Sequence, residues 1–292
     1  NPGDMVEVST KPKLEAVPFT QAISGLPKRV KIIWRPHPSI SVQSYVVEQR
    51  KFDGEDSWKR VCEVKGRLSA ECIDKNLEDG KSYQYRVIAR TNGGLYSQAS
   101  DVMVAKTKSI PPEVSNLSAS VDQPKKIILS WDGSKNQDVV YYNIYSSPTS
   151  FLLFTKLAST KNVGYEDLID TNGKTKYYKV TAVDNDGLES IKQDLPVKGK
   201  SLDAPPRPVL VSAVQNGSSI LLQWVSDSEN IQKFYLFKSF NGSTTRIVNI
   251  QSAIYEDTDV QAGVEYEYRV VGVDGFGLQS DKSNKIKIKF GK

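Results

Sequence analysis

Hydrophobic and polar residues alternate in short stretches along this chain, and one such stretch recurs three times with a terminal tryptophan. The segment Asp4–Trp34 reappears with nearly the same spacing as Asp101–Trp131, and its last strand recurs again as Ile220–Trp224. In both longer copies, a strand leads through a proline-bearing joint into the alternating strand. Repetition at intervals of about 90 residues indicates a row of similar domains and not one large fold.

Further alternating strands follow each tryptophan, and no segment carries a sustained helical period. One strand recurs as Tyr83–Val87, Lys176–Val180 and Tyr266–Val270. A Gly-Leu-x-Ser turn follows each of these strands and begins at Gly94, Gly187 and Gly277. The glycine of this turn is expected to take a positive φ. Short strands at regular intervals predict an all-β chain of three tandem, seven-stranded antiparallel sandwiches in an elongated array.

Short proline joints divide the repeats at Ile110–Pro112 and Ala204–Pro206, and stiff joints of this kind favour an end-to-end arrangement. We therefore predict domains over residues 15–108, 109–202 and 203–292. Residues 1–14 are interpreted as the tail of a preceding repeat and its linker, because residues 4–11 resemble a final strand. The chain is therefore expected to be the C-terminal part of a longer protein.

The repeated aromatic positions predict structural roles. The core tryptophans are expected to be Trp34, Trp131 and Trp224. They should face inward between two sheets, and for Trp34 this role is favoured over contact with a ligand. Tyr83 and Tyr266 occupy the position of a tyrosine corner, where the ring packs at one edge and its hydroxyl holds a crossing loop. The second repeat has Lys176 at this position, so we expect it to be the least stable of the three.

Composition restricts the classes of function. The net charge of +5 comes from 39 basic and 34 acidic residues scattered along the chain, which does not indicate a nucleic-acid partner. No run of 18 apolar residues occurs, so no membrane-spanning segment is predicted. The single histidine, His37, cannot supply several imidazoles to a metal, and the chain has neither a nucleophile motif nor a phosphate-binding loop. We expect a monomer without enzymatic activity, cofactor or metal.

The chain has two cysteines, Cys62 and Cys72, and their spacing fits no zinc motif. In the repeat pattern they fall on two successive strands joined by a turn, so a disulfide is geometrically possible. Whether the bond forms stays open at this point, because the loop is short and the other repeats lack it. A formed disulfide favours an oxidising, extracytoplasmic location.

One loop of the middle repeat is unusually apolar. Phe151, Leu152 and Leu153 precede Phe154, which aligns with Trp58 and is expected in the core. The three residues before Phe154 are expected either to pack on a neighbouring domain or to meet a partner, and we favour packing.

The segment after Trp34 predicts a stiff loop. Prolines at positions 36 and 38 hold it extended and lower the entropy lost on binding. Arg35 and His37 are then expected to be presented from an exposed tip of the sandwich, where binding residues concentrate. An ordinary solvated loop is the alternative that these residues leave open.

Three motifs together resemble the fibronectin type III domain: the tryptophan of the second strand, the Tyr-x-Tyr-Arg-Val strand and the Gly-x-x-Ser turn. The resemblance covers residues 15–291 in three units. A more specific match lies in the first unit, where Trp34–Pro38 and Val42 resemble the segment W-R-P-H-P-D-F-R-V of the Campylobacter fibronectin-like protein A family. The Asp, Phe and Arg of that segment are replaced by Ser39, Ile40 and Ser41.

That family consists of surface-exposed lipoproteins that bind host fibronectin. The resemblance therefore implies a bacterial adhesin with a role in virulence, held at the outer membrane by an anchor upstream of this chain. It also implies that fibronectin is bound chiefly by the first unit, through Trp34, Arg35, Pro36, His37, Pro38, Ser39, Ile40, Ser41 and Val42. The alternative is a passive spacer of type III modules in a secreted or surface protein whose activity lies upstream.

Overall fold

The computed structural model describes residues 14–52 and 57–291. Within these residues every regular element is a β-strand and no helix occurs. The strands form three sheets of three strands and three sheets of four, one of each kind in every repeat. The all-β class and the seven-stranded antiparallel sandwich are thereby confirmed. The segment 4–11, predicted to be a remnant strand, lies outside the described residues.

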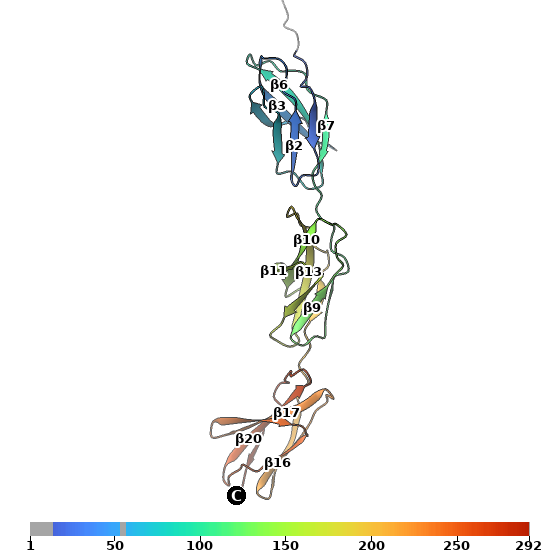
Figure 1. Cartoon of the computed structure of the whole chain (residues 1–292). Coiled ribbons are helices and arrows are strands. Elements are labelled where there is room, and N and C mark those ends of the chain that lie inside the picture. The colour runs from blue at the N-terminus through green and yellow to red at the C-terminus, as the bar shows by residue number, and fades with distance from the viewer. Residues whose placement is uncertain (1–13, 53–56, 292) are drawn as a thin grey trace, which may run out of the picture. The chain divides into compact units, whose positions relative to one another are not determined.

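The strands of the first repeat show how alternation in the sequence produces the sandwich. One sheet has the order β1 (Thr20–Ile23), β2 (Arg29–Trp34), β5 (Glu71–Lys75), and the other has the order β4 (Lys59–Lys65), β3 (Val42–Lys51), β6 (Ser82–Thr91), β7 (Met103–Lys106). Strands β3 and β6 pair along nearly their whole length (Figure 1). Along β6, buried and half-buried residues alternate, because successive side chains of a strand point to opposite faces of the sheet.

The other two repeats have the same arrangement of strands. In the second repeat the sheets are β12 (Gly164–Leu168), β9 (Lys126–Ser130), β8 (Ser118–Ala119) and β11 (Thr155–Thr160), β10 (Val139–Ser147), β13 (Thr175–Asp184), β14 (Val197–Lys200). In the third they are β15 (Val209–Asn216), β16 (Ser219–Val225), β19 (Ile254–Asp257) and β18 (Ser243–Ile250), β17 (Ile231–Phe240), β20 (Glu265–Asp274), β21 (Ile286–Lys289).

The compact units of the chain do not coincide with the three predicted domains. One unit contains the described residues up to position 112 together with residues 136–140 and 182–190, and the other contains the remaining described residues. The three sheet pairs therefore agree with a count of three sandwiches only roughly, since two segments of the second repeat, which include the start of β10 and the end of β13, are grouped with the first repeat.

A buried tryptophan lies between the two sheets in every repeat. Trp34, Trp131 and Trp224 are each at most 5% exposed. Each ring contacts an aromatic ring near the start of a strand in the facing sheet (β3, β10 or β17). The centroid separations are 5.2 Å for Trp34–Tyr45, 5.5 Å for Trp131–Tyr142 and 5.4 Å for Trp224–Phe234. The tryptophan and its aromatic neighbour thus link the three-stranded and four-stranded sheets.

The tyrosine corners hold loops by their hydroxyl groups. The Tyr83 hydroxyl accepts a hydrogen bond from the Glu78 N–H at 3.1 Å, and the Tyr266 hydroxyl accepts one from the Gln261 N–H at 2.8 Å. In the second repeat, Lys176 pairs instead with the Asp167 carboxylate. An ion pair therefore stands where the other repeats have an aromatic ring.

The glycine turns have the predicted backbone conformation, with φ of 76° at Gly94, 79° at Gly187 and 80° at Gly277. The serine three residues later has a role that the sequence did not reveal. Its hydroxyl accepts a hydrogen bond from a backbone N–H of the preceding strand, at distances of 2.9 to 3.0 Å for Ser97, Ser190 and Ser280. Each turn is thereby fastened to its own strand.

Candidate functional site

The loop between β2 and β3 of the first repeat is the candidate site, and one prediction about it is wrong. His37 is not presented to solvent, because only 4% of the residue is exposed. Its backbone N–H donates a hydrogen bond to the Tyr45 hydroxyl at 2.7 Å. The ring contacts both neighbouring backbones: the Ser39 N–H donates to Nδ1 at 3.1 Å, and Nε2 lies 3.3 Å from the Glu15 carbonyl oxygen.

These contacts indicate which nitrogen of the His37 ring donates and which accepts. Because Nδ1 accepts the Ser39 N–H, it carries no proton, and Nε2 must donate its proton to the Glu15 carbonyl. The ring thereby connects the loop to the segment that precedes β1. His37 supports the loop from its buried side, and its ring is not accessible to a partner.

Tyr45 holds the same loop from the opposite sheet. Its hydroxyl accepts the His37 N–H and donates to the Arg67 carbonyl at 2.7 Å, so it joins two loops at one point. In the second repeat the Tyr142 hydroxyl likewise accepts a hydrogen bond from the Ser134 N–H at 2.8 Å. We call this support of a loop by a tyrosine hydroxyl of the facing sheet the brace. It recurs in the second repeat, whereas the histidine ring occurs only in the first repeat.

The exposed part of the loop is small, partly apolar and cationic. Ile40 is 88% exposed, and Arg35, Pro38 and Ser41 are also exposed. The hydroxyls of Ser39 and Ser41 lie 2.8 Å apart. Of the other predicted site residues, Pro36 is half-buried, and Trp34 and Val42 are buried.

Phe19 belongs to this surface, and the sequence reasoning missed it. Its ring is 62% exposed, and the Arg35 guanidinium lies 5.7 Å from the ring centroid. Strand β1 pairs Thr20 with Trp34, so the residues beyond this pair, Phe19 and Arg35, meet at the end of the ladder. The Arg35 N–H donates to the Phe19 carbonyl at 3.0 Å. The sequence showed only that Phe19 precedes a strand. Without the register of that strand, its contact with Arg35 could not be predicted.

The two cysteines form a disulfide between β4 and β5, with their Cα atoms 6.8 Å apart. These strands belong to different sheets, so the bond fastens the sandwich across its edge. The loop that it closes contains Arg67, whose carbonyl receives the Tyr45 hydroxyl. The disulfide therefore supports the second of the two loops that Tyr45 connects.

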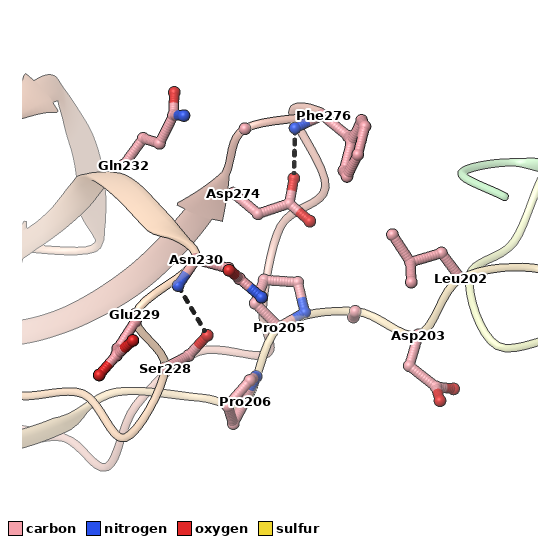
Figure 2. A pocket seen from close by; sticks show the side chains of 12 residues that line it. Leu202, Asp203, Pro205, Pro206, Ser228, Glu229, Asn230, Gln232, Asp274 and Phe276 are labelled. Carbon is pink, nitrogen blue, oxygen red and sulfur yellow. Dashed lines mark hydrogen bonds between the residues drawn. The ribbon is translucent and has the colours of Figure 1, made fainter. Parts of the chain in front are cut away.

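Two hollows lie on the third repeat and share Asp274 in their lining. The larger, of about 650 Å³, is lined by residues of the segment 202–206 and of the third repeat, Asp274 among them (Figure 2). One oxygen of Asp274 accepts hydrogen bonds from the N–H groups of Phe276 and Leu278, at 2.9 and 2.8 Å, so this carboxylate holds a turn.

Within the described residues, no group of three or more His, Cys, Asp or Glu side chains is arranged to hold a metal ion. The same part of the chain has no helix long and apolar enough to cross a membrane.

Comparison with known proteins gives partial matches. No protein-family model matches the chain. Human myomesin-2 is 25% identical over 268 residues, which are 83% of this chain and 18% of that protein. The amylopullulanase of Thermoanaerobacter thermohydrosulfuricus is 43% identical over 81 residues, which are 27% of this chain and 5% of that protein. The chain thus spans less than a fifth of the length of these relatives.

Among solved structures, the crystal structure of the chicken CNTN1 FN1–FN3 domains covers 96% of this chain and 100% of its own, with a TM-score of 0.32 and 16% identity. The sheets of each repeat, the recurring motifs and the match along most of the chain to myomesin-2 describe this chain as a fibronectin type III-like domain array.

Proposed function

We propose that this array is part of a bacterial surface adhesin, and that it binds host fibronectin chiefly through the loop between β2 and β3 of the first repeat. The observation that carries the proposal is the brace beneath this loop. The backbone N–H of the buried His37 is bonded to Tyr45, and its ring contacts the backbones of Glu15 and Ser39. The motif that resembles the adhesin family therefore builds a supported loop.

The brace favours binding for an energetic reason. A loop that is ordered before binding loses less conformational entropy when a partner docks on it. His37 and Tyr45 order this loop from beneath, and the prolines at positions 36 and 38 restrict its backbone. In this proposal His37 is a positioning residue, and Trp34 and Val42 contribute only to the core.

The contact residues are the exposed ones. Arg35 supplies a cation and several hydrogen-bond donors, while Ile40 and Phe19 supply exposed apolar area. Arginine and aromatic residues dominate the binding energy of many interfaces. The hydroxyls of Ser39 and Ser41 offer hydrogen bonds at the rim.

The test measures binding of the whole chain to immobilised fibronectin by surface plasmon resonance. We expect Arg35→Ala combined with Ile40→Ala to weaken binding at least about tenfold, since each removes a central contact. The matched control is Lys135→Ala with Val140→Ala, which removes an exposed cation and an exposed apolar residue near the equivalent loop of the second repeat. Equal binding by both variants and the parent chain, with unchanged circular dichroism, would exclude this loop.

The proposal includes a location. We propose that the protein is an outer-membrane lipoprotein displayed at the cell surface. The Cys62–Cys72 disulfide supports an oxidising compartment, because structural disulfides persist outside the cytoplasm. Cleavage by a protease added to intact cells tests surface display, and protection of the chain until the cells are lysed would contradict it.

A passive spacer is the second candidate, and one observation favours it. A segment of 81 residues is 43% identical to part of an amylopullulanase, a protein about twenty times longer than that segment. A type III-like module can therefore stand as one small part of a long protein. The spacer function predicts that neither the parent chain nor any single repeat binds fibronectin.

A further inference from the structure

The hairpin loop between β10 and β11 displays three consecutive apolar side chains. Phe151 is 82% exposed, Leu152 is 51% exposed and Leu153 is 90% exposed. The corresponding turn of the third repeat consists of Asn241 and Gly242, which are polar or lack a side chain.

Local hydrogen bonds give this loop a defined shape. The Thr149 N–H donates to the Ser147 hydroxyl and the Leu152 N–H donates to the Thr149 hydroxyl, both at 3.3 Å. These side-chain bonds replace the backbone ladder where the strand ends. The loop is therefore held by its own hydrogen bonds while its apolar side chains are exposed.

Lysines lie on the outer face of the adjoining sheet. The Lys179 ammonium lies 5.1 Å from the centroid of the Phe154 ring, which is half-buried and not in the core as predicted. The Lys192 ammonium lies 3.8 Å from the centroid of the Tyr145 ring, and Tyr145 pairs with Lys156 across β10 and β11.

Acidic residues are few in this region. The chain contains no Asp or Glu between Asp138 and Glu166, a stretch that includes the whole loop and both of its strands. Asp194 is the exposed acid that lies near Lys179, which donates to its backbone carbonyl at 3.0 Å. Cations therefore predominate beside the apolar tip.

We propose that this tip docks on the surface of a membrane that contains anionic lipids. Phe151, Leu152 and Leu153 form a narrow projection that can enter the interfacial region of a bilayer, and lysines beside it can meet lipid phosphates. The lysines beside the tip and the absence of Asp and Glu between Asp138 and Glu166 favour an anionic lipid surface over a protein partner. The inference is independent of fibronectin binding, since the residues lie in a different repeat.

The test is co-sedimentation of the whole chain with vesicles. We expect binding to phosphatidylcholine–phosphatidylglycerol vesicles, weaker binding at high salt, and little binding to phosphatidylcholine alone. Phe151→Ser with Leu153→Ser should lower the partition coefficient at least about tenfold. The control is Phe276→Ser, which removes an exposed aromatic residue from a turn of the third repeat.

Two further measurements separate the alternatives. Lys156→Glu with Lys192→Glu should reduce binding to the anionic vesicles. When vesicles are added, the tryptophan fluorescence of a Leu153→Trp variant, after subtraction of the parent chain's fluorescence, should shift to shorter wavelength. The proposal fails if the parent chain does not sediment with anionic vesicles or if the double serine variant sediments equally well. It also fails if gel filtration shows a dimer that the double serine variant abolishes, because the tip is then covered by a second copy.

Discussion

Replacing Tyr45 by Phe tests whether the brace orders the loop that we propose binds fibronectin. The substitution keeps the ring beside Trp34 and removes only the hydroxyl, which accepts the His37 N–H and donates to the Arg67 carbonyl, both at 2.7 Å. Phe234 stands at the same place beside Trp224 in the third repeat, which shows that the architecture accommodates a ring without a hydroxyl.

The cost follows from the surroundings of the two groups that lose their partner. His37 is buried, so its unpaired N–H costs about 1–3 kcal/mol. Arg67 is half-buried and its carbonyl can be hydrated, so this loss is about 0.5–1.5 kcal/mol. The free energy of unfolding of the first repeat should therefore fall by about 1.5–4.5 kcal/mol, and its melting temperature should fall by on the order of 10 °C.

Hydrogen exchange is the direct assay, because the His37 amide is itself the donor to Tyr45. We expect this amide to exchange at least about tenfold faster in the Tyr45→Phe variant, and fibronectin binding to weaken although Arg35 and Ile40 are unchanged. The control, Tyr142→Phe, removes the equivalent bond from the Ser134 N–H and should leave binding intact. An unchanged exchange rate at His37, or an equal loss of binding in the control, would refute the reasoning.

Three further predictions concern stability. The second repeat should unfold first on heating, since Lys176 replaces the corner tyrosine; hydrogen exchange that places the second repeat last would contradict this. Burial alone would raise the pKa of Asp184, but the ion pair with Lys108 and hydrogen bonds from two backbone N–H groups lower it. Asp184 therefore contributes stability above its ordinary pKa of 3.8, and that contribution is lost as the pH falls through its lower folded pKa. A Lys108→Met variant should show a weaker loss on acidification, and an identical pH profile of melting temperature would refute the assignment. Reducing the Cys62–Cys72 disulfide should destabilise the first repeat by about 3 kcal/mol, as measured by urea unfolding with and without dithiothreitol, and an unchanged midpoint would contradict this.

Features set by local pattern and repetition could be predicted from the sequence. The alternation of apolar residues indicated strands, and the recurrence of Trp34, Trp131 and Trp224 indicated how often the sandwich occurs. The positive φ of the turn glycines followed from residue type. These features depend on neighbours in the chain, so the sequence contains the information directly.

Features that depend on distant neighbours were not predicted. His37 is buried because Glu15 and Tyr45, 22 and 8 residues away in the chain, both contact it, and no local pattern gives their positions. Phe19 meets Arg35 because of the register of β1 on β2. Phe154 was assigned to the core by alignment, but Lys179 lies over its ring on the outer face of the sheet.

The disulfide has a mechanical consequence for a protein that is pulled from its ends. Residues between Cys62 and Cys72 cannot be drawn out while the sulfur bridge is intact, so the unravelled first repeat is shorter by about 30 Å than the same chain when reduced. Under tension, the loop that contains Arg67 stays closed by the disulfide after the hydrogen bonds between the surrounding strands have broken. The described residues of the other two repeats contain no such link, and stretching should therefore extend them to their full contour.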